Sequence, residues 1–252
     1  MFLVLLIACG PKHLHPPIQT DPVVQLSRAR SEAPPPPQIA RFTIRIETAD
    51  GVLSALGTGI YSAPNRFRVE LRGPIGPVQL VAACDGERVT AYILGKHTAY
   101  VGDDAEAAVR RWTGGAAGVD AVVLLLLGRL PDLGPPTTME PVPTWTRPDG
   151  SVVRAVLDDG SGHLARIDVV DARGVPALSA RFTPGTFPSH LDIDLPALHA
   201  SASVDYSDWQ TGAPPETAFS VVVPPGATIH SIDTIGRPAD APPTGPAELP
   251  IQ

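Results

Sequence analysis

The sequence contains few residues whose types and spacing could support catalysis. Ser161, Gly162 and His163 place a hydroxyl beside an imidazole, but they fall between two predicted strands, where such residues usually form a turn. Asp192 and Asp194 lie two residues apart on one predicted strand, so we expect solvated carboxylates on one face rather than a catalytic pair. No nucleophile elbow, zinc-protease motif or phosphate-binding loop occurs. We therefore expect a protein that is not an enzyme, with hydrolysis by an unrecognised constellation as the alternative.

Residues that bind metals are equally sparse. His13 and His15 are separated by one residue in a Pro-rich stretch, where two histidines are more often incidental than part of a metal site. Cys9 and Cys84 are the only cysteines, and they form no C-x-x-C motif. Cys84 ends a predicted strand, where it is expected to be a small buried hydrophobic residue. Neither a metal nor a cofactor is expected.

Cys9 follows the apolar run M-F-L-V-L-L-I-A and precedes Gly10. This segment resembles the lipobox of bacterial lipoproteins, in which the signal peptide is removed and the cysteine is acylated. The resemblance implies that residues 1–8 are a signal peptide and that Cys9 carries the lipid anchor. Because Gly10 is not the aspartate associated with inner-membrane retention, it also implies the periplasmic face of the outer membrane. The alternative is an apolar N-terminus with an incidental cysteine.

Composition limits the remaining classes. The chain has 252 residues, enough for one domain of about 180 residues with tails. A net charge of −7 and an isoelectric point near 5.4 argue against binding to nucleic acid. No apolar run reaches the roughly 18 to 20 residues of a membrane-spanning helix.

The 30 prolines of the chain gather towards its two ends. They predict that residues 9–39 form an extended tether that adds nothing to the core, because proline disfavours helix and sheet and favours polyproline II. Residues 40–236 are expected to form the folded domain, and residues 237–252 a disordered tail.

The clearest strand is R-F-R-V-E-L-R at 66–72, in which apolar and charged residues alternate. Such a period of two places one face on a core and the other in water. The strand ends at Gly73 and Pro74, after which Ile75 stands alone before Gly76 and Pro77. Ile75 either folds back into the core or projects outward towards an apolar surface.

Similar segments, separated by tight turns, predict one antiparallel sheet of about ten or eleven strands. The expected strands are approximately residues 40–47, 52–61, 66–72, 78–84, 88–94, 151–157, 164–170, 176–182, 191–195, 202–209 and 218–223. Gly57 and Gly59 in the second strand permit a bend or a close approach. Two helices follow the fifth or sixth strand, one at 105–112 with Asp103 as a possible cap, and one at 120–127. The second is apolar nearly all round, and it either fills the core or lines a cavity.

The order R-F-R-V-E-L, G-P-I-G, D-G-E-R-V, Y-V-G-D-D-A-E-A-A-V-R-R-W-T-G and L-L-L-G-R-L-P resembles the LolB family of outer-membrane lipoprotein receptors. The resemblance is strongest over residues 41–130. It implies a mainly β, α+β fold: a half-open antiparallel β-barrel, related to the carrier LolA, with inserted helices covering an apolar cavity for acyl chains. It also implies that Pro74, Ile75 and Gly76 form a loop that helps to insert cargo into the membrane.

The residues expected to line the cavity share the inward side of their strands or belong to the apolar helix. They are Phe42, Phe67, Val69, Leu71, Leu80, Leu124, Leu125 and Leu127. The partners that the resemblance implies are acylated lipoprotein cargo and a LolA-like periplasmic carrier, and a monomer is expected. The function would be to insert lipoproteins into the outer membrane. The alternative is an anchored structural or interaction lipoprotein whose barrel is filled by its own side chains or holds another apolar ligand.

Overall fold

The computed structural model describes residues 21–31, 35–73 and 76–232. Thirteen strands are present in this part of the chain. They are β1 (Gln38–Thr48), β2 (Gly51–Ser62), β3 (Arg66–Arg72), β4 (Val78–Cys84), β5 (Val89–Ile93), β6 (Thr98–Gly102), β7 (Thr144–Thr146), β8 (Val152–Leu157), β9 (Leu164–Val170), β10 (Pro176–Phe182), β11 (His190–Leu195), β12 (Ala200–Thr211) and β13 (Thr228–Ser231). The helices are α1 (Pro22–Ser31), α2 (Ala105–Trp112) and α3 (Val119–Leu126), with short 3-10 turns η1 (Leu94–Lys96), η2 (Pro196–Leu198) and η3 (Glu216–Phe219).

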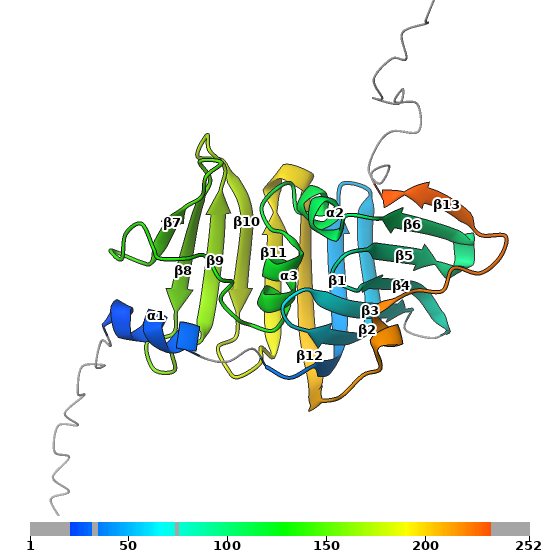
Figure 1. Ribbon diagram of the computed structural model, residues 1–252, viewed down its shortest axis with the longest axis horizontal. Coiled ribbons are helices and arrows are strands. Elements are labelled where there is room, and N and C mark those ends of the chain that lie inside the picture. The colour runs from blue at the N-terminus through cyan, green and yellow to red at the C-terminus, as the bar shows by residue number, and fades with distance from the viewer. Residues whose placement is uncertain (1–20, 32–34, 74–75, 233–252) are drawn as a thin grey trace, which may run out of the picture.

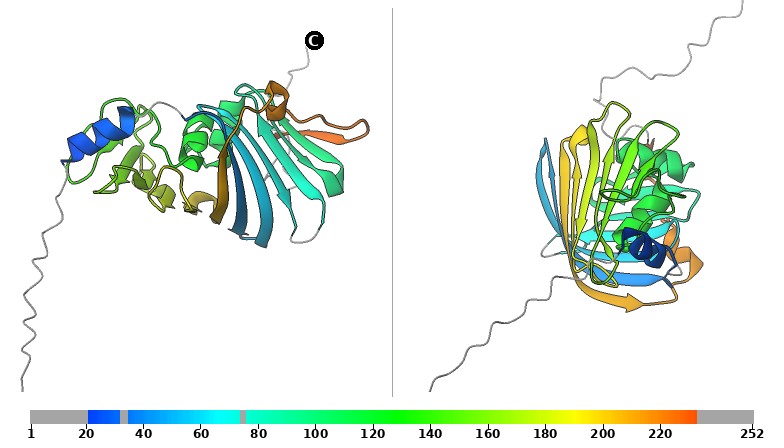
Figure 2. Two further views of the ribbon diagram at one scale, coloured as in Figure 1. Left: turned by 90° about the horizontal axis from the view of Figure 1, so that it is seen from below. Right: turned by 90° about the vertical axis from the view of Figure 1, so that its left-hand side faces the viewer.

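All thirteen strands join one sheet in the order β13-β6-β5-β4-β3-β2-β1-β12-β11-β10-β9-β8-β7 (Figure 1). Two antiparallel meanders, β1 to β6 and β7 to β12, are joined side by side by the pairing of β1 with β12. The sheet curves around α2 and α3 without joining its two edges (Figure 2). The predicted fold class, a mainly β half-open barrel with inserted helices, is confirmed. We call the concave side that faces these helices the inner face and the convex side the outer face.

The alternation of β3 determines which side chains reach the core. Phe67 on the inner face is 8 % exposed and joins a core that also contains Val89, Val123 and Leu127. Arg66 and Arg68 project from the outer face because neighbouring strand residues point to opposite sides. Cys84 is paired with Phe67 across β3 and β4 and is fully buried, as predicted.

Gly57 and Gly59 allow two aromatic rings to lie against the backbone of β2. A Cβ atom added at Gly57 would lie 2.1 Å from Cε2 of Phe42, and one added at Gly59 would lie 2.3 Å from the hydroxyl oxygen of Tyr61. Both distances are far below van der Waals contact, so only glycine leaves room for the rings. The close approach that the sequence predicted is therefore confirmed at both positions.

The two inserted helices are fixed to each other by the D-D-A-E segment. Asp104, rather than the expected Asp103, caps α2 and accepts a hydrogen bond from the backbone N–H of Ala107 at 2.9 Å. Glu106 accepts a hydrogen bond from the N–H of Val119, the first residue of α3, also at 2.9 Å. Gly118 lies directly against the Glu106 carboxylate, where a Cβ atom would not fit. A single carboxylate of α2 thus caps α3.

Residues 22–31 correct the prediction of an extended tether, because they form α1 below β8 and β9 (Figure 1). Asp21 accepts a hydrogen bond from the N–H of Val23 at 2.8 Å. Pro22 begins the helix, where its missing N–H would have had no partner inside the helix. Leu26 is 5 % exposed and packs into the core, so part of the supposed tether belongs to the folded domain. No helix in the described ranges has the length and apolarity needed to cross a membrane.

The expected last strand at 218–223 is also wrong. Residues 216–231, which we call the strap, cross the outer face and end in β13, which pairs parallel with β6. Arg68 donates from Nη1 to the carbonyl oxygens of Ala218 and Ser220, at 3.3 Å and 3.1 Å. The side chain of Phe219 is 3 % exposed, and the Arg66 guanidinium carbon lies 4.9 Å from its ring centre. Arginines of β3 therefore hold the strap on the sheet, and its backbone does not extend the antiparallel ladder.

Candidate functional site

The eight residues predicted to line a cavity fall into two groups. Phe42, Phe67, Leu125 and Leu127 are buried in the core beneath or within the helical layer. Val69, Leu71, Leu80 and Leu124 are only half-buried. The predicted wall is therefore partly solid core and partly accessible apolar surface.

The burial of side chains on the inner face decreases along three neighbouring strands. On β3, burial decreases from Phe67 to Val69 and Leu71, and on β4 it decreases from Cys84 to Leu80. On β5 it decreases from Val89, which is fully buried, to the half-buried Ile93. All three strands become more accessible towards the same end, where the β3–β4 connection and η1 lie.

Four half-buried residues at this end form what we call the apolar strip. They are Val69, Leu71, Leu80 and Ile93. Leu71 is directly opposite Leu80, and Leu80 is directly opposite Ile93, so three adjacent strands contribute to one surface. Opposed side chains in an antiparallel sheet lie about 5 Å apart, so Leu71, Leu80 and Ile93 are immediate neighbours on the inner face.

Helix α3 forms the boundary of the apolar strip. It packs against β3, and Leu125 and Leu127 are 7 % and 0 % exposed. Leu124 is half-buried. The helix thus contributes the buried Leu125 to the core, and it also carries the half-buried Leu124.

A cluster of aromatic side chains that the sequence analysis did not predict supports the end of α3. Tyr61 and Tyr206 are almost completely buried, and Trp209 lies 4.6 Å from Tyr206 between ring centres. The Tyr206 hydroxyl donates to the carbonyl oxygen of Leu126 at 3.4 Å. Burial raises the pKa of both tyrosines, so each hydroxyl stays protonated and can donate a hydrogen bond. These residues come from strands that are distant in sequence, and no local pattern marks them.

Several other predicted site residues lie outside the described residues. These are Cys9, His13, His15, Pro74 and Ile75. Gly76, the last residue of the predicted insertion loop, is exposed and has a φ of +135°, a conformation that only glycine adopts readily. Gly76 therefore precedes β4 in a backbone conformation that favours glycine.

The residues considered for catalysis occupy structural positions. Ser161 lies in the β8–β9 turn and donates from its hydroxyl to Asp158 at 2.7 Å. Asp192 is half-exposed on β11 and lies 3.1 Å from Nε2 of His190, whose pKa is raised mainly by a hydrogen bond with Asp205. Within the described ranges, no group of three His, Cys, Asp or Glu side chains is placed to hold a metal ion.

Comparison with known proteins finds similar folds but no similar sequences. No family model matches the chain, and no curated protein matches it. A solved structure of a LolA superfamily protein from Nitrosomonas europaea superposes with a TM-score of 0.50 at 12 % identity, covering 80 % of this chain and 98 % of the other. The chain and this protein therefore share a fold.

Two further solved structures are less similar to this chain. A DUF1329 family protein from Desulfovibrio piger has a TM-score of 0.48 at 10 % identity and covers 81 % of this chain and 97 % of its own. A putative outer membrane lipoprotein-sorting protein domain from Vibrio parahaemolyticus has a TM-score of 0.40 at 10 % identity, with coverages of 78 % and 94 %.

Proposed function

We propose that this protein is a lipid-handling binding protein rather than an enzyme, and that the apolar strip receives the acyl chain of a lipoprotein. The observation that carries the proposal is the half-buried apolar surface on the inner face of a LolA-type barrel. An acyl chain needs only apolar contact and exclusion of water, so no ionised group is required. Within this proposal the protein resembles LolB, takes cargo from a LolA-like carrier and transfers it to the outer membrane.

A charge placed in the apolar strip tests this proposal. We expect Leu80→Glu to weaken binding of a fluorescent fatty-acyl probe at least tenfold, because a carboxylate would have to be desolvated against the chain. Val156→Glu is the matched control, because Val156 is 38 % exposed on the outer side of β8, whereas Val153, Ala155 and Leu157 are buried. Binding by Leu80→Glu equal to that of the unmodified protein would contradict the proposal.

The filled barrel remains the second candidate, because Leu125 and Leu127 pack into the core. In that case the protein would be an anchored structural or interaction lipoprotein. Mass spectrometry of lipid extracted from the purified protein distinguishes the two: a bound acylated lipid favours the first candidate, and its absence favours the second.

We also propose that Cys9 is acylated and anchors the protein to the periplasmic face of the outer membrane. The supporting observation is the lipobox-like run before Cys9. Several acyl chains, at about 0.8 kcal/mol per buried methylene, would make attachment practically permanent. Cys9→Ala should therefore move the protein from the membrane fraction to the soluble fraction without loss of folding. Recovery of the unmodified protein in the soluble fraction would argue against the anchor.

We propose that Ile75 contacts the bilayer during cargo release. The β3–β4 connection lies at the accessible end of the apolar strip, and Gly76 and Pro77 beside Ile75 are exposed. Burial of one Ile contributes roughly 1.5–3 kcal/mol, enough to orient an anchored domain but not to anchor it. Ile75→Glu should leave thermal stability nearly unchanged and reduce transfer of cargo to liposomes. A loss of more than about 2 kcal/mol in the free energy of unfolding would place Ile75 in the core instead.

A further inference from the structure

Several strand connections lie together at one end of the sheet. Glu47 of β1 pairs with Ser201 of β12, so the β1–β2 hairpin and η2 are neighbours, and Ala49 and Pro196 from these two connections line one hollow. The β9–β10 turn lies beside η2, because β10 and β11 are antiparallel neighbours. The β3–β4 connection, which contains Ile75, and η1 lie at the same end. We call these connections the rim; they comprise residues 48–53, 72–77, 94–97, 171–175 and 196–199.

The rim exposes large apolar side chains, although turns normally hold polar residues, glycine or proline. Val52 and Leu53 of the β1–β2 hairpin are 57 % and 51 % exposed, and Val175 and Leu198 are 49 % and 42 % exposed. In the described ranges, the loops that join neighbouring strands at the opposite end contain no exposed large apolar residue. The exposed apolar side chains of these connections are therefore gathered at one end of the sheet, as is typical of a contact surface.

The rim also carries a small excess of positive charge. Arg72 at the end of β3 and Lys96 in η1 are both exposed. Asp50 in the hairpin opposes one of these charges, and Asp171 is paired with Arg173 at 2.8 Å. The whole chain has a net charge of −7, so the rim differs in sign from the protein as a whole.

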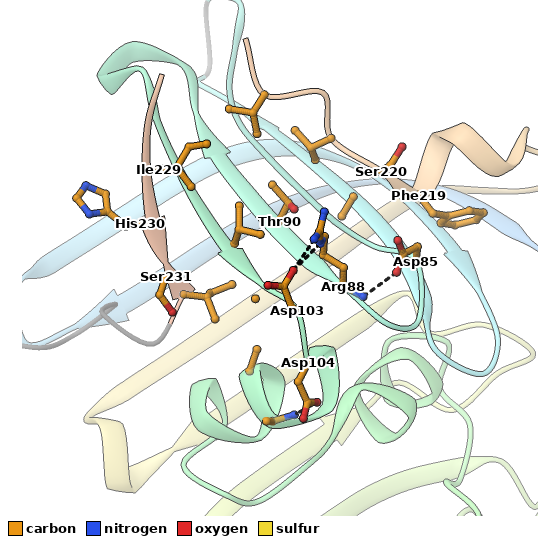
Figure 3. Close-up of a pocket in the computed structure, with 18 of the residues that line it drawn as sticks. Asp85, Arg88, Thr90, Asp103, Asp104, Phe219, Ser220, Ile229, His230 and Ser231 are labelled. Atoms are coloured by element: carbon orange, nitrogen blue, oxygen red, sulfur yellow. Dashed lines mark hydrogen bonds and ion pairs between the residues drawn. The ribbon is translucent and has the colours of Figure 1, made fainter. Parts of the chain in front are cut away.

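The opposite end of the sheet is acidic. A groove of about 770 Å³ lies beneath the strap on the outer face, and Asp85, Asp103 and Asp104 at this end are among its lining residues (Figure 3). Arg88 offsets Asp103 at 2.6 Å, and Asp159 is exposed in the β8–β9 turn at the same end. A surface of anionic lipid would therefore attract the rim and repel the opposite end.

The anchor proposed at Cys9 leaves both ends of the sheet within reach of a bilayer. The twelve residues from Gly10 to Asp21 span at most about 40 Å. They lead to α1, which is held at the acidic end by a hydrogen bond from Nε2 of Gln25 to Asp159 at 3.3 Å. The longest strands, such as β12 with 12 residues, are also about 40 Å long. The anchor therefore does not decide which end faces the lipid, and the surface chemistry of the two ends does.

We propose that the rim is a membrane-contact surface for a bilayer that contains anionic lipid. The apolar residues of the β1–β2 hairpin and η2 enter the headgroup region, and Arg72 and Lys96 meet lipid phosphates. The accessible end of the apolar strip then faces the bilayer. The inference rests on the membrane role proposed for Ile75 and extends it to the whole rim, but it does not require an acyl chain in the apolar strip.

Dyes that respond to the polarity of their surroundings test this orientation. In full-length Cys9→Ala protein, Cys84 is fully buried, so a dye labels a cysteine introduced at the surface. With vesicles of phosphatidylcholine and phosphatidylglycerol, the emission of a dye at Leu53→Cys should shift to shorter wavelength. A dye at Val24→Cys is the control, because Val24 is 48 % exposed on α1 at the acidic end, and its emission should not change. A shift at Val24→Cys with none at Leu53→Cys, or no shift at either position, would overturn the inference.

Cosedimentation with the same vesicles tests the contribution of single residues in the Cys9→Ala background. Leu53→Glu should weaken binding about fivefold, because the carboxylate loses apolar contact and is repelled by anionic headgroups. Val156→Glu should bind like the parent protein, because Val156 is 38 % exposed on β8, outside the rim. Lys96→Glu should weaken binding only when the vesicles contain phosphatidylglycerol. Equal binding by Leu53→Glu and Val156→Glu would contradict the inference.

Ile75→Glu in this assay separates the rim from the loop proposed above. Weaker binding by both Ile75→Glu and Leu53→Glu supports a contact that includes the whole rim. Weaker binding by Ile75→Glu alone would confine the contact to its loop, which overturns the inference and leaves the earlier proposal in place. Weaker binding by Leu53→Glu alone would support the rim and remove the role of Ile75. Thermal unfolding of Leu53→Glu should match that of the parent protein, since half of the Leu53 side chain is already exposed.

Discussion

Gly57→Ala is expected to lower the free energy of unfolding by about 3 kcal/mol, the upper part of the range for overpacked cores. The added Cβ atom would lie 2.1 Å from Cε2 of Phe42, so the ring would have to move. Phe42 is 5 % exposed and lies edge-on to Tyr206 with 5.8 Å between ring centres, which leaves it no free space to enter. Urea titration followed by Trp fluorescence measures the change.

Gly95→Ala is the matched control for this prediction. A Cβ atom added at Gly95 meets nothing within 4 Å, so the change should stay within about 0.5 kcal/mol. Adding Phe42→Leu to Gly57→Ala should recover part of the lost stability, because the smaller side chain leaves the space that the methyl group needs. Equal effects of the two glycine substitutions would mean that Phe42 is not held against the strand.

Leu127→Ala should be similarly destabilising, by about 3 kcal/mol, because Leu127 is fully buried at the end of α3 and its removal leaves a cavity. Leu124→Ala should cost less than about 1 kcal/mol, since Leu124 is only half-buried. The same denaturation experiment measures both variants.

The effects of the two leucine substitutions on probe binding should rank in the opposite order to their effects on stability. We expect Leu124→Ala to alter the affinity for a fatty-acyl probe more than a folded Leu127→Ala protein does, because Leu124 is half-buried and Leu127 is enclosed in the core. If Leu124→Ala destabilises the fold as strongly as Leu127→Ala and leaves probe binding unchanged, α3 acts only as a plug.

Local patterns predicted the elements that depend on local chemistry. The strands at Arg66–Arg72 and Val78–Cys84 and the helix at Ala105–Trp112 have the bounds that alternation and turn residues indicated. The role of Gly57 was also foreseeable, because glycine inside a strand usually marks a close approach. For the cavity, strand parity identified the inner face correctly, but it contained no information on how far α3 would cover that face.

The sequence-based predictions failed where contacts between residues distant in sequence determined the structure. The many prolines near the N-terminus concealed α1, although Asp21 followed by Pro22 is a good helix start and Leu26 needed a core to pack against. The valines at 221–223 have high strand propensity, yet this part of the strap is held by arginines of β3 instead of by backbone pairing with a neighbouring strand. The groove on the outer face could not be anticipated, because it exists only once the strap has crossed the sheet.

The pairing of β1 with β12 has a consequence for how the chain folds. These two strands lie side by side near the middle of the sheet, although more than 150 residues separate Thr48 from Ala200. Contacts so distant in sequence make folding slow, because a large loop must close before they contribute stability. Until β12 is available, β1 exposes an unpaired edge on which another chain could form hydrogen bonds. The unfinished chain should therefore need protection from aggregation until β12, its last long strand, has been made.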